Sequence, residues 1–281
     1  MKLETILKCI KCNCKLTKSK DKFVCDKKHS FGIKDEIPDF ILDKDKKILE
    51  EEFKAQKNSV WEYKNIETKA GTMSWRNWKK RLIVDKKGLV LDNGCGPGKL
   101  SLMIPEGNVV IGSDVSLDML KEAKKRINFV VRAMAEKLPF KNETFDVVYT
   151  DSMLHHLKNP IDGIKEVHRV LKKDGIAVFS ETHAALINRK LRRDAYKNKE
   201  KFSEWHKNFE KKELLEIIKP YFEIYSIENV SYLGYMYEGT NRKIPCDKYL
   251  MKTFLAFDRI ISKIPIVKTQ SWHIIVKGIK K

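Results

Sequence analysis

Long apolar runs are missing from this chain of 281 residues. No stretch approaches the roughly 20 consecutive apolar residues that a membrane-spanning helix needs. The N-terminal residues, MKLETILKCIKC, contain no continuous apolar segment of the kind found in signal peptides. We therefore expect a cytoplasmic protein with no transmembrane segment, which sets aside secreted and integral membrane classes.

Glycine, proline and arginine are also scarce. With 13 Gly, 8 Pro and 42% hydrophobic residues, the composition indicates a folded core rather than a disordered or collagen-like chain. Only 10 of the 57 basic residues are arginine, the residue whose planar fork favours nucleic-acid recognition. The net charge of +19 can therefore reflect either solvated surface lysines or a surface that binds RNA, and both interpretations stay open. Residues 85–180 hold 15 basic and 13 acidic side chains, whereas residues 181–281 hold 21 and 12.

Four of the six cysteines lie within the first 25 residues. A disulfide framework would spread cysteines along a secreted chain, so this crowding indicates a metal site in a reducing compartment. Cys9 and Cys12, followed by Cys25 and His29, form two pairs of ligands of the kind that hold structural Zn²⁺ in a closed tetrahedral site. Cys14 is a spare thiol, and it remains an alternative to Cys12.

The segment 23–40 (FVCDKKHSFGIKDEIPDF) also resembles a known arrangement. It is similar to the zinc ribbon of bacterial 23S rRNA guanine-N1 methyltransferases, which share the Cys-x2-Cys-x12-Cys-x3-His spacing. Similar ribbons form the activator subunit of eukaryotic tRNA and protein methyltransferases. The resemblance implies a small zinc ribbon over residues 1–45 and leaves its substrate open.

A charged and aromatic segment follows at residues 46–84. One interpretation is a helical connector that covers the next domain. The other is a lid over a ligand pocket, with Trp61 or Tyr63 touching the ligand. The sequence leaves both open.

From Gly88 onward the pattern alternates between strands and helices, which predicts a Rossmann-like α/β domain over residues 85–281. Such a sheet is parallel, is covered by helices on both faces, and binds ligands at the carboxyl ends of its strands. Strands are expected at 89–92, 109–113, 129–132, 145–150 and 176–180, and helices at 98–104, 116–126 and 160–171.

The first predicted strand runs into a glycine loop, DNGCGPG, at residues 92–98. Glycines let the backbone pass close to a ligand. A dinucleotide fingerprint is not matched, because Lys99 replaces its third glycine, Pro97 removes an amide donor and Asp92 would repel a phosphate. An acidic residue suits a ligand with an ammonium and a sulfonium instead. Asp114, at the end of the second strand, can accept from both hydroxyls of a ribose.

These motifs together resemble class I S-adenosylmethionine (SAM)-dependent methyltransferases, particularly the subgroup that includes the ubiquinone/menaquinone C-methyltransferases. The resemblance implies SAM as the cofactor. It is carried by LVLDNGCGPG (89–98), IGSDVS (111–116), AEKLPF (135–140) with FDVV (145–148), LHHL (154–157) and RVLKKDG (169–175).

The resemblance also implies a set of cofactor-binding residues. Met134 stands where the family commonly has an Asp that accepts from adenine, so backbone groups or Glu136 would serve there. The implied set is Asp92, Gly94, Cys95, Gly96 and Gly98 for the methionine end, Asp114 and Val115 for the ribose, Met134 and Ala135 beside adenine, and Asp151 at the end of the fourth strand.

His155 and His156 follow the fourth strand, beside the expected position of the methyl group. Histidine titrates near neutrality, so either is a candidate general base; the alternative is that both only pack or face solvent. His168, within a predicted helix, is expected to be structural.

The methyl acceptor is open between a small molecule, quinone or lipid-linked compound and an rRNA or tRNA base. A non-catalytic scaffold is a third, more remote reading. The insertions 183–206 and 232–268 are expected to cover the acceptor, and Arg189, Arg192 and Arg193 in the first could touch a phosphate. Part of the second, residues 249–267, is amphipathic and basic, which fits core packing or peripheral membrane contact.

Overall fold

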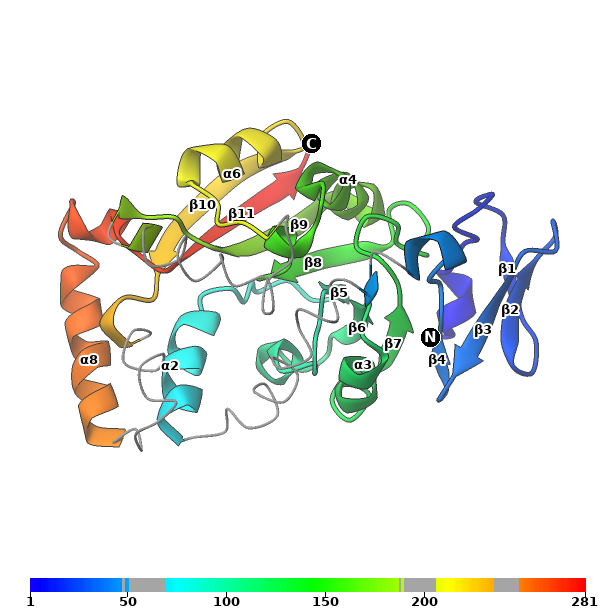
Figure 1. Ribbon diagram of the computed structural model, residues 1–281, viewed down its shortest axis with the longest axis horizontal. Helices are drawn as coiled ribbons and strands as arrows, with labels where there is room; N and C mark the ends of the chain where they lie inside the picture. Colours follow the sequence, from blue (N-terminus) through cyan, green and yellow to red (C-terminus); the bar gives the residue numbers. More distant parts are fainter. Residues whose placement is uncertain (47–48, 51–68, 187, 190–205, 235–247) are drawn as a thin grey trace.

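A computed structural model of the 281-residue chain describes residues 1–46, 49–50, 69–186, 188–189, 206–234 and 248–281 (Figure 1). Trp61 and Tyr63, and likewise Arg192 and Arg193, lie outside the described residues. Within the described part, no helix combines the length and apolarity needed to cross a membrane.

The N-terminal residues form a small antiparallel sheet with the strand order β1-β2-β3-β4. A polar turn at residues 19–21 separates the first two strands. The elements are a short 3-10 turn η1 (Leu3–Thr5), then β1 (Leu16–Lys18), β2 (Lys22–Cys25), β3 (Ser30–Lys34) and β4 (Ile37–Pro38).

The central sheet has seven strands in the order β10-β11-β9-β8-β5-β6-β7. Val230, at the end of β10, pairs with His273, at the start of β11, so the chain leaves and re-enters the sheet at the same end of the strands. The five strands predicted between residues 89 and 180 pair in parallel, as expected, whereas β11 runs antiparallel to both of its neighbours. The strands are β5 (Leu89–Asn93), β6 (Val109–Asp114), β7 (Phe129–Arg132), β8 (Phe145–Asp151), β9 (Leu171–Thr182), β10 (Phe222–Val230) and β11 (His273–Lys280).

Helices cover both faces of this sheet, as expected, with α4 and α6 on one side and α2 and α3 on the other (Figure 1). The predicted helix 98–104 is only a 3-10 turn, because Pro105 holds Ile104 in an extended conformation. The helical elements are α2 (Lys69–Lys79), η2 (Leu100–Met103), α3 (Leu117–Ala123), η3 (Leu154–His156), α4 (Pro160–Val170), α6 (Lys211–Ile218), α8 (Lys248–Ile261) and η4 (Val267–Thr269).

Alternating strand residues form two apolar clusters, one on each face of the sheet. Val90 and Val147 belong to the cluster under α2 and α3, whereas their neighbours Leu91 and Val148 belong to the cluster under α4 and α6. The second cluster continues into the ribbon, where it includes Phe23, Phe31 and Phe40. The ribbon and the central sheet therefore share one core.

Backbone hydrogen bonds also tie the ribbon to the edge strand β7. The Phe40 N–H donates to the Arg132 carbonyl at 2.8 Å, and the Lys8 N–H donates to the Pro139 carbonyl at 2.8 Å. The Arg132 guanidinium forms a 3.0 Å ion pair with Asp39. The ribbon thus packs against the segment that follows β7, where the family resemblance implies the adenine.

Candidate active site

Four acidic side chains lie where strands of the central sheet end. Asp92 is the penultimate residue of β5, Asp114 and Asp151 end β6 and β8, and Glu181 is the penultimate residue of β9. Because these four strands are parallel, their carboxyl ends meet at one edge. The sequence predicted the first three. Glu181 was missed, although its position at a strand end was the same kind of signal.

The glycine loop after β5 is held against β6 by its own amides. The N–H groups of Gly94 and Cys95 donate to the Ser113 carbonyl at 2.8 and 3.0 Å, and the Gly96 N–H donates to Oδ2 of Asp114 at 2.9 Å. Gly96 has φ +50°, and a Cβ there would meet nothing within 4 Å. No side chain therefore blocks the approach of a ligand to the backbone at Gly96.

Only the backbone of Cys95, and not its thiol, is available to a ligand. Its side chain is buried and leaves no room for a Cβ at Gly112, which would lie 2.8 Å from the sulfur. Burial raises the pKa of the Cys95 thiol well above its usual value. Gly98 closes the turn by donating its N–H to the Cys95 carbonyl at 2.9 Å.

Asp92 is a buried carboxylate with an unsatisfied oxygen. The residue is 2% exposed, and its Oδ2 atom has no hydrogen-bond partner in the described part of the chain. Burial raises the pKa of Asp92 to about 7, with the nearby Lys79 opposing the shift and Asp114 adding to it. An ammonium group would supply the missing donor, so Asp92 fits the methionine end of SAM.

Asp114 and its neighbours fit the ribose. Each carboxylate oxygen accepts one backbone N–H, from Gly96 at 2.9 Å and from Ser116 at 2.8 Å, and each keeps a further lone pair for a hydroxyl. Burial raises the pKa of Asp114. The Val115 carbonyl accepts from Nε of Arg132 at 2.8 Å, which fixes the backbone beside Asp114.

The segment after β7 holds the residues expected beside adenine. Ala135 is buried and Met134 is half-buried, and the Lys137 N–H donates to the Met134 carbonyl at 3.1 Å. Glu136, also half-buried, has its pKa raised by burial. The segment therefore turns at Met134, next to the ribbon.

Lys79, at the end of α2, reaches the same edge of the sheet. It forms an ion pair with Asp151, and its Nζ lies 4.1 Å from the centre of the Trp78 ring. The side chain is buried. Lys79 could not be predicted from the sequence, because nothing there distinguishes one lysine among the 47 of this chain.

His155 is fixed by Glu181. Its Nδ1 atom lies 2.6 Å from Oε2 of Glu181, and both side chains are buried. The other carboxylate oxygen accepts the N–H groups of Met153 and Leu154 at 3.1 and 2.7 Å. His156 is half-buried, with its ring centre 4.3 Å from that of His155. Both candidate bases therefore lie just beyond β8.

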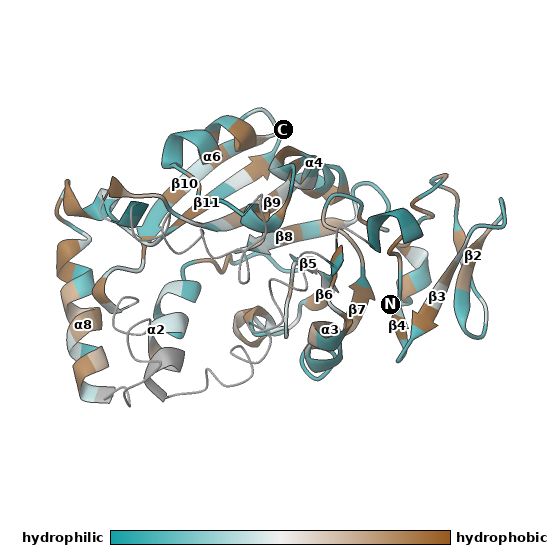
Figure 2. Ribbon diagram, in the orientation of Figure 1, coloured by the Kyte–Doolittle hydropathy of each residue, from teal (hydrophilic) through white to brown (hydrophobic). Residues whose placement is uncertain are grey.

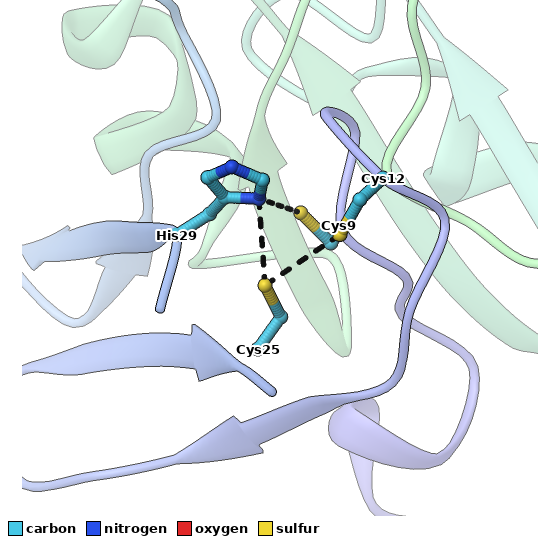
Figure 3. Close-up of side chains that lie close together, drawn as sticks. All are labelled: Cys9, Cys12, Cys25 and His29. Atoms are coloured by element: carbon cyan, nitrogen blue, oxygen red, sulfur yellow. Dashed lines mark hydrogen bonds between the residues drawn. The ribbon is translucent and has the colours of Figure 1, made fainter. Parts of the chain in front are cut away.

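In the ribbon, Cys9, Cys12, Cys25 and His29 point toward one another (Figure 3). The Cys12 and Cys25 sulfurs are 3.6 Å apart, and Nδ1 of His29 is 3.5 Å from the sulfurs of Cys9 and Cys25. Tetrahedral Zn²⁺ would separate two sulfurs by about 3.8 Å, and sulfur from nitrogen by about 3.6 Å. The four side chains thus fit a metal.

Cys14 lies outside this group. Its thiol donates to the Cys12 carbonyl at 3.7 Å. The Cys14 backbone amide is the largest of the causes that lower the pKa of Cys12 to about 6. The structure therefore brings Cys12, rather than Cys14, into the ligand set.

Comparison with known proteins agrees with this geometry. Residues 91–179 match the family model described as a methyltransferase domain, which covers β5 to β9 and excludes the ribbon. An uncharacterized protein of Methanocaldococcus jannaschii is 42% identical over 107 residues, 36% of this chain and 41% of that protein. The ubiquinone/menaquinone biosynthesis C-methyltransferase of Geotalea uraniireducens is 32% identical over 120 residues, 38% of this chain and 51% of that enzyme. The chain thus spans about half the length of these relatives.

A solved structure shows the same fold over more of the chain. The SAM-dependent methyltransferase of Thermotoga maritima, titled a possible histamine N-methyltransferase, has a TM-score of 0.58 and 20% identity. The match covers 82% of this chain and 98% of that one. The chain therefore has a Rossmann-like fold similar to that of this methyltransferase, and residues 91–179 are the part that matches the methyltransferase family model.

Proposed function

We propose that this chain is a SAM-dependent methyltransferase. The observation that carries the proposal is the buried, unsatisfied Oδ2 atom of Asp92 beside the open backbone of Gly96. Asp92 would accept from the ammonium of the cofactor and Asp114 from its ribose hydroxyls. Lys79, paired with Asp151, lies where it can offset the carboxylate of the methionine end.

SAM, when bound, supplies a methyl group on an already activated leaving group. The residues of this chain need only align an acceptor with that methyl group and exclude water. His155, oriented by Glu181, would take a proton from an acceptor that must lose one, with His156 as the neighbouring alternative.

The favoured acceptor is a small molecule, such as a quinone or a lipid-linked compound. A relative with 32% identity is named for quinone biosynthesis. In addition, α8 presents apolar side chains to solvent, including Tyr249 and Ile260, which are 75% and 61% exposed; Figure 2 shows much of this helix in brown. An exposed apolar and basic helix fits peripheral contact with a membrane that holds such an acceptor.

A base in rRNA or tRNA is the second candidate acceptor. It is supported by the ribbon, where we propose that Cys9, Cys12, Cys25 and His29 hold a structural Zn²⁺. Reduced thiols of this kind also favour a cytoplasmic location. The ribbon surface is basic, with exposed Lys11, Lys15, Lys18, Lys20, Lys22, Lys27 and Lys28.

A labelled-methyl assay separates these acceptors. The full chain is incubated with methyl-labelled SAM and either total RNA or a small-molecule and lipid extract, side by side. We expect label in the extract, and less label with Asp114→Ala at the same cofactor concentration, because that variant should bind SAM more weakly. Label only in RNA would establish the second candidate, and label in neither would contradict the proposed activity.

A further inference from the structure

Three histidines gather beyond the end of β8. His155 and His156 belong to η3, and His206 comes from the end of the first insertion. Their ring centres are 4.3 to 4.9 Å apart, and one ligand nitrogen of each lies within 4.8 Å of the others. We propose that His155, His156 and His206 bind a divalent transition metal such as Zn²⁺, leaving a coordination position for an oxygen or nitrogen atom of the methyl acceptor.

The ligand set matches a reactive rather than a structural metal site. Imidazole nitrogen is a preferred ligand of zinc, copper, iron and nickel. Three histidines with one open position are the ligands of a catalytic Zn²⁺, whereas four protein ligands close a structural one. At Zn–N distances of 2.0–2.1 Å, tetrahedral geometry separates the nitrogens by about 3.4 Å, so the three nitrogens, now within 4.8 Å of one another, would move closer together on binding the ion.

Glu181 supplies the outer partner that such a site requires. A metal-bound histidine usually directs its other ring nitrogen to a carboxylate, which fixes the ring and makes it a better ligand. Nδ1 of His155 lies 2.6 Å from Oε2 of Glu181, so Nε2 would be the nitrogen that binds the metal. With a metal bound, His155 and His156 would be ligands in place of the general bases proposed above for the metal-free site. Glu181 is itself fixed by the backbone amides of Met153 and Leu154, and its charge would offset that of the ion.

The backbone around His206 is attached to the same edge of the sheet. The Lys207 N–H donates to the His155 carbonyl at 3.4 Å, and the Phe209 N–H donates to the Thr182 carbonyl at 3.2 Å. His206 is therefore held beside η3 by its own chain. A metal would fasten the end of the insertion to the methyltransferase domain at the place where an acceptor would lie.

Metal content tests the site directly. The full-length protein is equilibrated with excess Zn²⁺, freed of unbound metal by gel filtration, and analysed for zinc per chain. We expect two equivalents, one in the ribbon and one at the histidines. His206→Gln should lose one equivalent, whereas the matched control His168→Gln should keep both, because His168 lies on α4 against the rings of Tyr221 and Phe222.

Cobalt substitution identifies which site loses its metal. Co²⁺ bound by thiolates in the ribbon absorbs strongly through sulfur-to-metal charge transfer, and this band should be unchanged in His206→Gln. The weaker absorption of the nitrogen-ligated Co²⁺ should disappear. Glu181→Gln should keep the histidine ligands but weaken metal binding about 10- to 100-fold.

Zinc content that is the same in His206→Gln as in the unsubstituted chain, at one or at two equivalents, would overturn the metal site. The metal count does not depend on the proposed methyl transfer, although the role in acceptor binding does. SAM binding is therefore measured by calorimetry in the same samples. A chain that binds two metals but no SAM would contradict the proposed function and leave the histidine site standing.

Discussion

At the scale of single residues, we expect Asp92 to make the proposed SAM binding pH-dependent. Its pKa in the folded chain is raised to about 7, above the ordinary value of about 4. Ionisation of Asp92 therefore lowers the stability of the folded chain. This loss of stability is absent at pH values below the unfolded-state pKa, and it is complete at pH values above about 7. An ammonium beside the carboxylate favours the ionised form, so SAM binding releases a proton below this pH.

We accordingly expect the affinity for SAM to rise about tenfold per pH unit below 7 and to level off above it. Calorimetry between about pH 6 and pH 8 measures this dependence. Asp92→Asn cannot ionise and should bind weakly with little pH dependence. An unchanged slope in that variant would assign the titration to another group.

The acids at the strand ends were predictable residue by residue, whereas their partners were not. Asp92, Asp114 and Asp151 could be placed because parallel strands end at a common edge. Lys79 and His206 lie at that edge but belong to segments that are far away in sequence. No local sequence pattern distinguishes them from other lysines and histidines. Cys95 was correctly placed in the loop, but its inward side chain depends on the space left by Gly112.

At the scale of elements, Arg132 joins the ribbon to the backbone beside Asp114, where we propose that the ribose binds. Its guanidinium is 3.0 Å from Asp39 and 2.8 Å from the Val115 carbonyl. Hydrogen bonds to charged groups contribute about 1.5–3 kcal/mol when partly buried. We expect Arg132→Gln to lower the free energy of unfolding by roughly this amount in denaturant titrations.

Lys34→Gln is the matched control for Arg132→Gln. Lys34 also pairs with Asp39, at 3.6 Å, but its side chain is 60% exposed. Exposed ion pairs contribute little, so its unfolding free energy should stay nearly unchanged. Equal losses in both variants would show that Asp39, rather than the link to Val115, accounts for the effect.

The ribbon should unfold together with the central sheet. Cys9 and Cys25 are buried in the same apolar cluster as Phe140, so loss of the ribbon metal would disturb the shared core. Cys25→Ser should lose one equivalent of zinc and lower the melting temperature of the whole chain in calorimetric scans. Cys14→Ser should retain both the metal and the melting temperature.

A separate low-temperature transition in Cys25→Ser, with the main transition unmoved, would instead show an independent ribbon. The shared core was not visible in the sequence, which indicated two units joined by a linker. Alternation of apolar residues was sufficient to predict β5 to β8 within one residue. This alternation does not indicate whether β11 runs parallel or antiparallel to its neighbours. Strand direction depends on where the connecting segment re-enters the sheet, and that connection has no periodic pattern.

At the scale of the whole molecule, the ribbon and α8 lie at opposite ends of the long axis, with the carboxyl edge of the sheet between them (Figure 1). The ribbon packs beside the residues expected at the adenine, and the histidines lie just beyond β8. This arrangement separates the part of the chain that would hold the donor from the part that would meet the acceptor. These assignments all require that SAM binds at the carboxyl edge of the central sheet.

Calorimetric binding of SAM to the full chain tests this claim most directly. We predict that the unsubstituted protein binds SAM and that Asp114→Ala binds roughly 10- to 100-fold more weakly, since a carboxylate between two hydroxyls is worth about 1.5–3 kcal/mol. Asp118→Ala, an exposed acid four residues away on α3, should bind as the unsubstituted protein does. No binding by the unsubstituted protein, or equal binding by Asp114→Ala, would contradict the account.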